Sequence, residues 1–547
     1  MRSPETRARR ASISLLLFFV LGLATPAAAA AQATTYVPDQ DPAYGDADAL
    51  IAAGWVRTVI AGRRPFSRLT LARMVVEARS TLARAAAVPG PRFTEALDRL
   101  ERVFGPEIQA LCTEEGTGCP SLPTGVRVRS LAADATWAAS PSRAIPTSYD
   151  ARASRIDAEL NPLLQSNQGR ILADGGTVGL EALADVQLGT RLAAQIRPRL
   201  WTAAPAAGGS DTGATLLEGY ARALVGNAAL EVGRNHIASG HGRHGGTILS
   251  DNARGLDLVR LSLDRSARLP WVLRALGPIG VSALLADLGA SSDTPHSKLV
   301  VFEGSMRPHP NLEVGGTLLN HQGGGGPPAT FGERLRDIFF VFEQQNFISD
   351  RVVGWDVRLT LPSARTQLNV EMMTTDTRWE LMEPFTTEAA WLGGVRVFGL
   401  GPDGRADLWA EARYAGVRPH THHQFTSGLT LDGRVIGDAL GPVASGLAAG
   451  IDWRGAAQTV SLSVARERYS GADLYEDVQG DAPFAWIRIE DRPDEVRVRV
   501  LADWTMDGGW RGLSPSVRVG YERVARFAFT PESRSNGLLQ LRLEYRP

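Results

Sequence analysis

The sequence predicts a mostly β protein, in which a large transmembrane antiparallel β-barrel follows a small periplasmic helical domain. Three observations lead to this fold class. An export signal opens the chain, the apolar period changes from 3.6 to 2 near residue 125, and the later apolar rows have the length of a tilted membrane crossing. The expected domains are a signal peptide at 1–33, a helical periplasmic domain at 34–124 and an outer-membrane barrel at 125–547.

The first 33 residues have the three parts of a secretory signal peptide. Four arginines within positions 2–10 precede an apolar run at 13–24, and the small-residue site Ala31-Gln32-Ala33 follows. The apolar run is too short for a comfortable helical span. We expect export with cleavage after Ala33 or a nearby alanine. In the rest of the chain the longest apolar candidate, 269–289, is interrupted by Arg274 and Gly277-Pro278, so we expect no transmembrane helix.

Residues 34–124 show helical periodicity. The segment 70–86 places Leu71, Met74, Val75, Ala78 and Leu82 on one face, and 94–111 does the same with Leu97, Leu100, Val103 and Phe104. A third helix is expected at 46–55. Proline and glycine, including Gly105-Pro106, punctuate these segments. The expectation is a small helical domain with an ordinary apolar core.

After residue 125 apolar and polar residues alternate, so each strand has one apolar and one polar face. In 180–200 the even positions are mainly apolar, from Leu180 to Leu200, while the odd positions include Glu181, Asp185 and Arg197. The same alternation occurs in 353–372, as a hairpin turning at 362–364, and in 496–504, 517–522 and 539–545.

A β-sandwich and a membrane barrel both produce this alternation. Strand lengths of about nine to eleven residues favour the barrel. So do aromatic residues near the row ends, at Trp355, Trp504, Tyr521 and Tyr545. At roughly 20 to 26 residues per strand with its connections, 125–547 accommodates about 16 to 20 strands. The Gly/Pro-rich segments 205–213, 323–328 and 399–405 suit long external loops.

Composition narrows the function classes. The formal net charge is −1, which argues against a nucleic-acid partner. Lys298 is the single lysine of the sequence. The two cysteines, Cys112 and Cys119, flank a Gly-containing turn and are expected to form a disulfide in an oxidising compartment, although free thiols fit the spacing too. No histidine cluster lies near them, which argues against zinc.

The segment 233–246, GRNHIASGHGRHGG, contains a G-x-G-x-x-G match at 240–245. A dinucleotide site would need a buried apolar strand before the match and a helix after it, and neither is present. The histidines here and in HTHH (420–423) follow no metal-ligand spacing, and no G-x-S-x-G elbow occurs. We therefore expect no enzyme activity, no cofactor and no metal.

The remaining interpretation of this segment is a tight Gly-rich connection at the mouth or inside of the barrel. Its planar donors and its carboxylate suit sugar hydroxyls and acidic sugars, although the same groups could only hydrogen-bond one another and fix the loop. The candidate polysaccharide-binding residues are Arg234, Asn235, His236, Arg243, Asp251 and Asn252.

Several segments resemble the capsule-assembly Wzi family of outer-membrane proteins. They are 36–78, 230–261 (LEVGRNHIASGHGRHGGTILSDNARGLDLVRL), 309–326 and 346–376, in a family-like order over most of the chain. The resemblance implies an 18-stranded barrel with a periplasmic helical bundle and an occluded lumen. It also implies a surface lectin that helps to hold capsular polysaccharide on the cell. No catalytic residues carry over.

The expected function is an outer-membrane, lectin-like protein that binds surface polysaccharide and assists capsule or exopolysaccharide assembly or attachment. Its expected partners are that polysaccharide and outer-membrane lipid, and we expect a monomer. Two alternatives stay open: a substrate-selective porin or sugar channel, because a charged Arg-rich interior also suits a porin, and an exported soluble β-sandwich enzyme.

Overall fold

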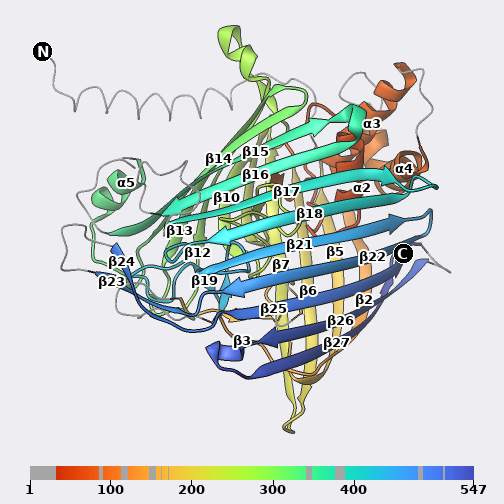
Figure 1. The fold of residues 1–547 in the computed structure, drawn as a ribbon. Helices are drawn as coiled ribbons and strands as arrows, with labels where there is room; N and C mark the ends of the chain where they lie inside the picture. Colours follow the sequence, from red (N-terminus) through yellow and green to blue (C-terminus); the bar gives the residue numbers. More distant parts are fainter. Residues whose placement is uncertain are drawn as a thin grey trace, which may run out of the picture.

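The chain forms a closed antiparallel β-barrel with helices at one end and long loops at the other (Figure 1). The computed structural model describes residues 32–84, 90–111, 121–146, 156–161, 163–164, 166–170, 172–339, 348–375, 388–477, 485–508 and 512–547. Within these residues the barrel has 18 strands, counting the two-residue β11 with β10 as one interrupted strand. This confirms the predicted fold class.

Neighbouring barrel strands are neighbours in the sequence, and the first and last strands close the ring. The barrel strands are β2 (Gly125–Ala138), β5 (Gly175–Leu188), β6 (Leu192–Pro205), β7 (Asp211–Val225), β8 (Ala228–Asn235), β10 (Leu256–Leu263) with β11 (Ala267–Arg268), β12 (Pro278–Asp287), β13 (Lys298–His309), β14 (Leu312–Gln322), β15 (Ser349–Leu361), β16 (Thr366–Thr375), β17 (Ala389–Leu400), β18 (Ala406–Ala415), β21 (Ala444–Arg454), β22 (Gln458–Tyr469), β25 (Glu495–Met506), β26 (Leu513–Ala525) and β27 (Ser533–Tyr545). Closure pairs Leu131 of β2 with Tyr545 of β27, and no barrel edge stays unpaired in this seam.

Shorter elements lie in the connections between these strands. They are β3 (Arg143–Ala144), β4 (Glu159–Leu160), η2 (Trp271–Leu276), α5 (Phe331–Phe339), η3 (Pro362–Ala364), β19 (Thr430–Leu431), β20 (Arg434–Val435), β23 (Ala472–Asp477), β24 (Ala485–Asp491) and η5 (Phe527–Phe529). The hairpin predicted at 353–372 is confirmed, because β15 and β16 pair across η3.

Side chains along each barrel strand alternate between the outer surface and the lumen, as the sequence pattern predicts. Leu180 is 57 % exposed on the outer face, whereas its neighbour Glu181 is 7 % exposed and points into the barrel. The predicted run 180–200 is interrupted by a turn at 189–191, with Leu188 paired to Leu192. Because that turn has an odd number of residues, the parity of inward and outward positions is the same on both sides. The alternation therefore runs through the turn unbroken.

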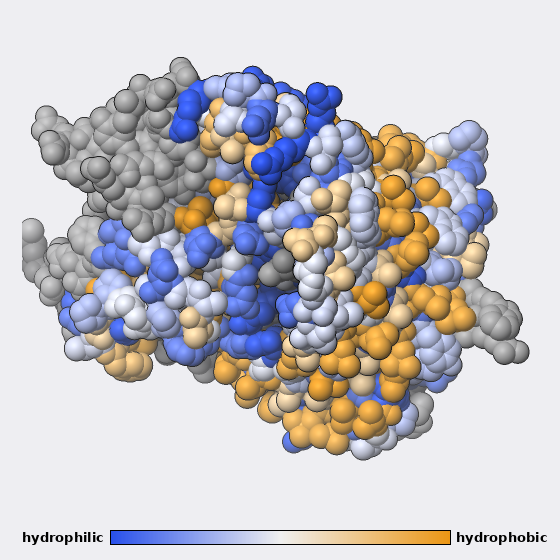
Figure 2. All heavy atoms as spheres, turned by 90° about the horizontal axis from the view of Figure 1, so that it is seen from below, coloured by the Kyte–Doolittle hydropathy of each residue, from blue (hydrophilic) through white to orange (hydrophobic). Residues whose placement is uncertain are grey.

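The outer surface of the barrel carries the apolar rows. Exposed leucine, valine and aromatic side chains include Leu131, Leu200, Leu447, Val519 and Tyr521. Figure 2 shows hydrophobic residues over a broad area of the barrel wall, bordered by hydrophilic residues toward the end with the long loops. A belt of this kind faces lipid in outer-membrane barrels. Among the described residues no helix combines the length and apolarity that a membrane crossing requires.

The N-terminal helices are α2 (Ala43–Ala52), α3 (Arg68–Arg84) and α4 (Pro91–Leu111). The predicted inner face of α3 is buried, as are Leu97, Leu100 and Phe104 of α4. Val103, predicted on the same face, is 43 % exposed and does not belong to the buried face of α4. Two helical segments meet at the kink at Phe104, directly before the Gly105-Pro106 pair that was expected to interrupt them.

Arg92 of α4 fixes the helices to the barrel. Its fully buried guanidinium donates to Asp46 of α2 at 2.9 Å and to Asp407 of β18 at 2.8 Å. The helices lie at the end with the short turns, as Figure 1 shows. In outer-membrane barrels that end faces the periplasm. The segment 399–405 belongs to this end, where Arg405 pairs with Glu95, so its expected place in a long external loop was wrong.

Two segments enter the lumen from opposite ends and join there. From the helical end, Arg63 and Arg64 form β1; from the other end, Ala238 and Ser239 form β9, and the two strands pair antiparallel. Ala61 and Gly62 also donate their backbone N–H groups to Glu313 of the barrel wall. Around the inner part of the long loops, Ile248, Leu429 and Ile436 contribute to a buried apolar cluster. These segments and loops therefore fill part of the lumen.

Two predictions concern residues that the structure does not describe. The signal peptide, except for its last two residues, and the pair Cys112 and Cys119 lie outside the described residues.

Lys298 starts β13 at the long-loop end, where its ammonium contacts the Asp287 carboxylate at 2.5 Å and its side chain is 40 % exposed.

Candidate functional site

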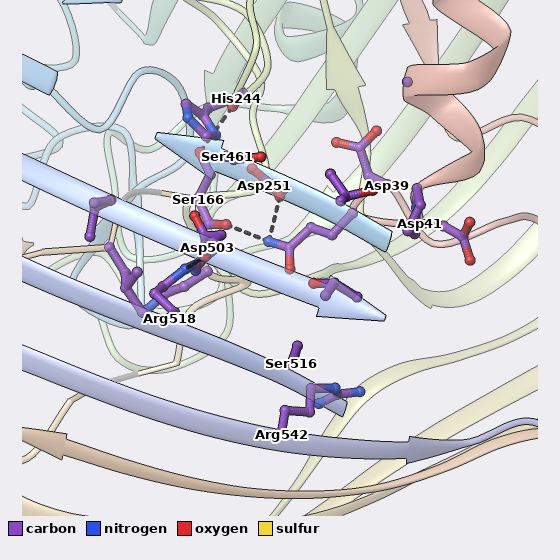
Figure 3. A pocket seen from close by; sticks show the side chains of 18 of the residues that line it. Asp39, Asp41, Ser166, His244, Asp251, Ser461, Asp503, Ser516, Arg518 and Arg542 are labelled. Carbon is purple, nitrogen blue, oxygen red and sulfur yellow. Dashed lines mark hydrogen bonds and ion pairs between the residues drawn. The ribbon is translucent and has the colours of Figure 1, made fainter. Parts of the chain in front are cut away.

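A polar cavity of about 560 Å³ lies inside the barrel. Strands β2, β5, β6, β21, β22, β25, β26 and β27 supply most of its wall, and the segment 38–48 and the loop 242–251 supply the opposite side. Its volume falls within the roughly 300–1,000 Å³ that is usual for ligand sites in proteins. Figure 3 shows the cavity with residues from both sides.

Two rows of inward side chains cross six adjacent strands and form one side of the cavity, which we call the polar wall. In the first row successive paired residues are Asp452, Ser461, Asp503, Arg518, Gln540 and Thr136. In the second row they are Arg454, Thr459, Thr505, Ser516, Arg542 and Asp134. All twelve residues line the cavity. Register thus brings together side chains that the sequence spreads over more than 400 positions.

The polar wall alternates charge pairs with hydroxyl and amide groups. Arg518 forms an ion pair with Asp503, and Gln540 donates to Thr136 at 3.1 Å. Figure 3 shows Asp503 beside Arg518 and Ser516 near Arg542. Hydroxyl and amide groups both donate and accept hydrogen bonds, and paired ions hold fixed donors in place. This arrangement suits a ligand rich in hydroxyl groups.

The side facing the polar wall comes from the N-terminal segment and the long loops. Gln40 donates its amide hydrogens to Asp251 at 2.9 Å and to the carbonyl of Ser166, which Figure 3 draws as dashed lines. Burial, and after it the charge of Asp39, raise the pKa of the Asp251 carboxyl to about 7. This side of the cavity is therefore built by contacts between segments that reach the lumen from opposite ends.

At one end of the polar wall, four guanidiniums surround a single carboxylate; we call this group the arginine cluster. Glu181 lies 2.6 Å from Arg170, 2.7 Å from Arg197, 3.3 Å from Arg542 and 3.7 Å from Arg199. Arg199 also binds both oxygens of Asp134. Gly179 leaves the space that the Arg199 guanidinium fills, because a Cβ at this position would overlap it.

Two of the six sequence-predicted site residues line the cavity, Arg243 and Asp251. Arg243 pairs with Asp452 at 2.8 Å, and its guanidinium lies 4.7 Å from the ring centre of Trp409.

The other four lie elsewhere. Arg234 pairs at 2.7 Å with Asp257, whose side chain is partly exposed. Asn235 is buried and donates to Glu231 at 2.6 Å. His236 is buried with Nδ1 3.7 Å from a Glu218 oxygen, and Asn252 donates to the carbonyl of Val435 at 2.9 Å. The structure thus gives these four residues partners within the protein.

The Gly-rich match at 240–245 holds a carboxylate that belongs to the protein itself. Glu371 of β16 accepts backbone N–H groups from His241, from Gly242 at 2.9 Å and from Thr247 at 3.1 Å. A Cβ on Gly240 would overlap this carboxylate, which explains the glycine. The loop is a nest for a carboxyl group of the protein itself, and the nucleotide interpretation has no support in this geometry.

Sequence reasoning missed most of the polar wall and the arginine cluster. Their signal was present in the charged rows of the strands, such as Arg499, Asp503, Arg518 and Arg542, but only strand register shows that they face one cavity. For metals, the described part of the chain holds no group of three or more His, Cys, Asp or Glu residues placed to bind an ion.

The sequence profile of the family described as capsule assembly protein Wzi matches residues 145–536. The chain belongs to the Wzi family. The membership agrees with the resemblance seen in the sequence. A closed barrel with an apolar outer belt places this Wzi-family member in the outer membrane.

Among solved structures, Wzi of Escherichia coli is similar over 94 % of this chain and 100 % of that one, with a TM-score of 0.66 and 16 % identity. It is described as an outer membrane protein involved in group 1 capsule assembly and as a carbohydrate-binding β-barrel. The Pseudomonas aeruginosa barrels OprD (9 % identity, TM-score 0.41, 77 % of this chain and 93 % of that one) and OccD3 (11 %, 0.42, 77 % and 91 %) also align. No curated protein sequence matches the chain.

Proposed function

We propose that this Wzi-family protein binds a polysaccharide and assists the assembly or attachment of capsule or exopolysaccharide at the cell surface. Family membership supports the process, and the description of the E. coli barrel as carbohydrate-binding supports the ligand class. The observation that carries the proposal for this chain is the polar wall, in which hydroxyl, amide and ion-paired groups line one cavity in two continuous rows.

The groups of the polar wall match the chemistry of sugars. A sugar presents many hydroxyl groups that donate and accept, and Ser461, Thr505 and Ser516 offer the same two-way capacity on neighbouring strands. The paired guanidiniums add planar donors that are held in position by Asp503 and Asp134. A cavity of about 560 Å³ suits a short stretch or an end of a chain of sugars.

We also propose that the role is binding and not catalysis. The carboxylates of the polar wall are held by arginines: Asp134 by Arg199, Asp452 by Arg243 and Asp503 by Arg518. Each of these carboxylates is thus bound to a guanidinium of the protein and holds that donor in place.

Cell-bound polysaccharide tests the proposed function. A strain that lacks the gene should release more polysaccharide into the medium and keep less on the cell, and the unaltered gene should restore retention. Thr505→Val with Thr459→Val removes two cavity hydroxyls at nearly constant volume and should restore less. Thr202→Val, on an exposed part of β6, is the matched control and should restore fully. Unchanged retention in the deletion strain would refute the function.

A sugar-selective channel is the second candidate, because the cavity lies inside a barrel. The joined segments at β1 and β9 and the packed loops around Ile248 weigh against it. Planar-bilayer conductance separates the two, since a channel gives a steady open current and an occluded binding protein gives none.

A further inference from the structure

The arginine cluster brings four guanidiniums close to one carboxylate. Glu181 is shared by Arg170, Arg197, Arg199 and Arg542. The other carboxylates within reach are shared as well. Asp134 serves both Arg199 and Arg542, Glu544 serves Arg542 and Arg546, and Glu218 serves Arg197 and lies near His236. Four carboxylates thus match the four guanidiniums of the cluster in number, but all four guanidiniums approach the same one, Glu181.

Arg170 shows the consequence of this crowding of guanidiniums. It lies in the loop before β5, its guanidinium pairs with Glu181, and its Nε is buried without an acceptor among the described residues. Burial lowers the pKa of Arg170, and the nearby Arg197, Arg199 and Arg542 lower it further against the effect of Glu181. An additional anion beside Arg170 would relieve the repulsion between the guanidiniums.

We propose that the arginine cluster binds the carboxylate of an acidic sugar, so that the polar wall and the cluster together select polysaccharides that contain uronic acids. The inference rests on the proposed function and deepens it. The planar guanidinium fork matches the geometry of a carboxylate. Thr136 and Thr177 line the same cavity beside the cluster, where they can bind the hydroxyl groups of the same sugar ring.

The exposed fractions of the side chains distinguish a ligand site from a purely structural ion network. Glu181 and Asp134 are nearly inaccessible, at 4 % and 3 % side-chain exposure, while Arg542 and Arg170 retain 22 % and 21 %. The acids are thus covered, and the guanidiniums present the accessible surface toward the cavity.

The test compares an oligosaccharide of two to three sugars carrying glucuronate with the same oligosaccharide after reduction of its carboxyl group. Titration calorimetry on the purified, detergent-solubilised full chain gives both affinities. The acidic form should bind about 10- to 100-fold more tightly, and the difference should shrink at high salt. Arg170→Gln should reduce the preference about tenfold or more, with little change for the reduced form.

Further variants and a further probe complete the test. Arg234→Gln makes the same chemical change at a residue that does not line the cavity, and it should keep the full preference. Arg542→Gln provides a second cluster variant, and heat-modifiability on a gel shows for each variant whether the barrel is folded. Inorganic phosphate is the third probe, and it should compete only weakly because it lacks the sugar ring.

The outcomes separate the inference from the proposed function. Equal binding of the acidic and the reduced oligosaccharide, or a preference that survives both arginine substitutions in folded protein, overturns the acidic-sugar site and leaves the polysaccharide role standing. Phosphate binding as tight as that of the acidic oligosaccharide would show a general anion site and also overturns it. Absence of binding to every oligosaccharide, together with unchanged retention in the deletion strain, overturns both.

Discussion

The backbone N–H of Gly240 donates a hydrogen bond of 2.8 Å to the carbonyl oxygen of Gly62. Gly62 reaches the lumen from the helical end and Gly240 from the long-loop end, and the bond continues the ladder between β1 and β9. Each segment is also held by a barrel glutamate, Glu313 for Gly62 and Glu371 for the loop after Gly240. The occupied lumen is therefore a hydrogen-bonded unit that is fixed to the wall on two sides.

The first prediction concerns conductance. The unaltered protein in planar bilayers should give no steady open current. Glu371→Ala removes the acceptor for His241, Gly242 and Thr247, and each unsatisfied N–H costs about 1–3 kcal/mol. The loop should loosen, and transient openings should appear in single-channel records. Glu532→Ala, on an exposed connection, should remain silent. A steady ohmic current from the unaltered protein would contradict the lumen arrangement.

The second prediction concerns Gly179. A methyl group here overlaps the guanidinium of Arg199, which must then leave Asp134. Breaking a buried ion pair costs about 3–5 kcal/mol. Gly179→Ala should therefore unfold at a lower temperature, and calorimetry or heat-modifiability measures the shift. Gly176→Ala on the same strand is the control, because a Cβ there meets open space. Equal stability of the two variants would refute the role given to Gly179.

The third prediction concerns the attachment of the helices. Arg92→Met leaves the Asp407 carboxylate buried without its guanidinium, at a cost of about 3–5 kcal/mol. The helical segment should become sensitive to protease while the barrel stays intact on a gel. Arg84→Met, at an exposed helix end, should change stability by no more than about 0.5 kcal/mol. Full protease protection in the Arg92 variant would show that this arginine does not fix the helices.

The fourth prediction concerns pH and Asp251. Its folded-state pKa, about 7, lies above the usual value of 3.8, so protonation favours the folded loop. This stabilisation is fully present below a pH of about 4 and is lost as the pH rises through 7. After correction for intrinsic rates, amide exchange in 236–255 should be faster at pH 8 than at pH 5.

Asp251→Asn should remove this pH dependence, because the amide keeps an acceptor for Gln40 and does not titrate. Asp211→Asn, on an exposed hairpin, should leave the dependence as it is. A dependence that persists in the Asp251 variant would assign it to another group.

The barrel could be predicted from the sequence because its signal is local. Alternation in Leu539, Leu541, Leu543 and Tyr545 requires no knowledge of a partner strand, and these residues indeed face outward. The turn at 189–191 could not be predicted, because even-numbered residues face outward both before and after it. Val103 was placed on the buried face but is exposed, because an apolar residue in the right period does not show where a helix's buried face ends.

The candidate site could be predicted much less well, because it depends on register and on distant pairs. The glycines of 240–246 look like a ligand loop until Glu371, more than 120 residues away, is known to occupy it. Arg243 and Asp251 were found from side-chain chemistry alone. Arg542 belongs to a row that was visible, but its meeting with Asp134 at the barrel seam appears only after closure.

Lys298 offers a way to read which direction the barrel points in a living cell. Apart from the amino terminus, it carries the single primary amine of the chain, and it sits partly exposed where the long loops begin. An amine-reactive dye that cannot pass the outer membrane should therefore label intact bacteria at one known position. If Lys298 is labelled only in broken cells, the helical end of the barrel, and not the end with the long loops, faces the cell exterior.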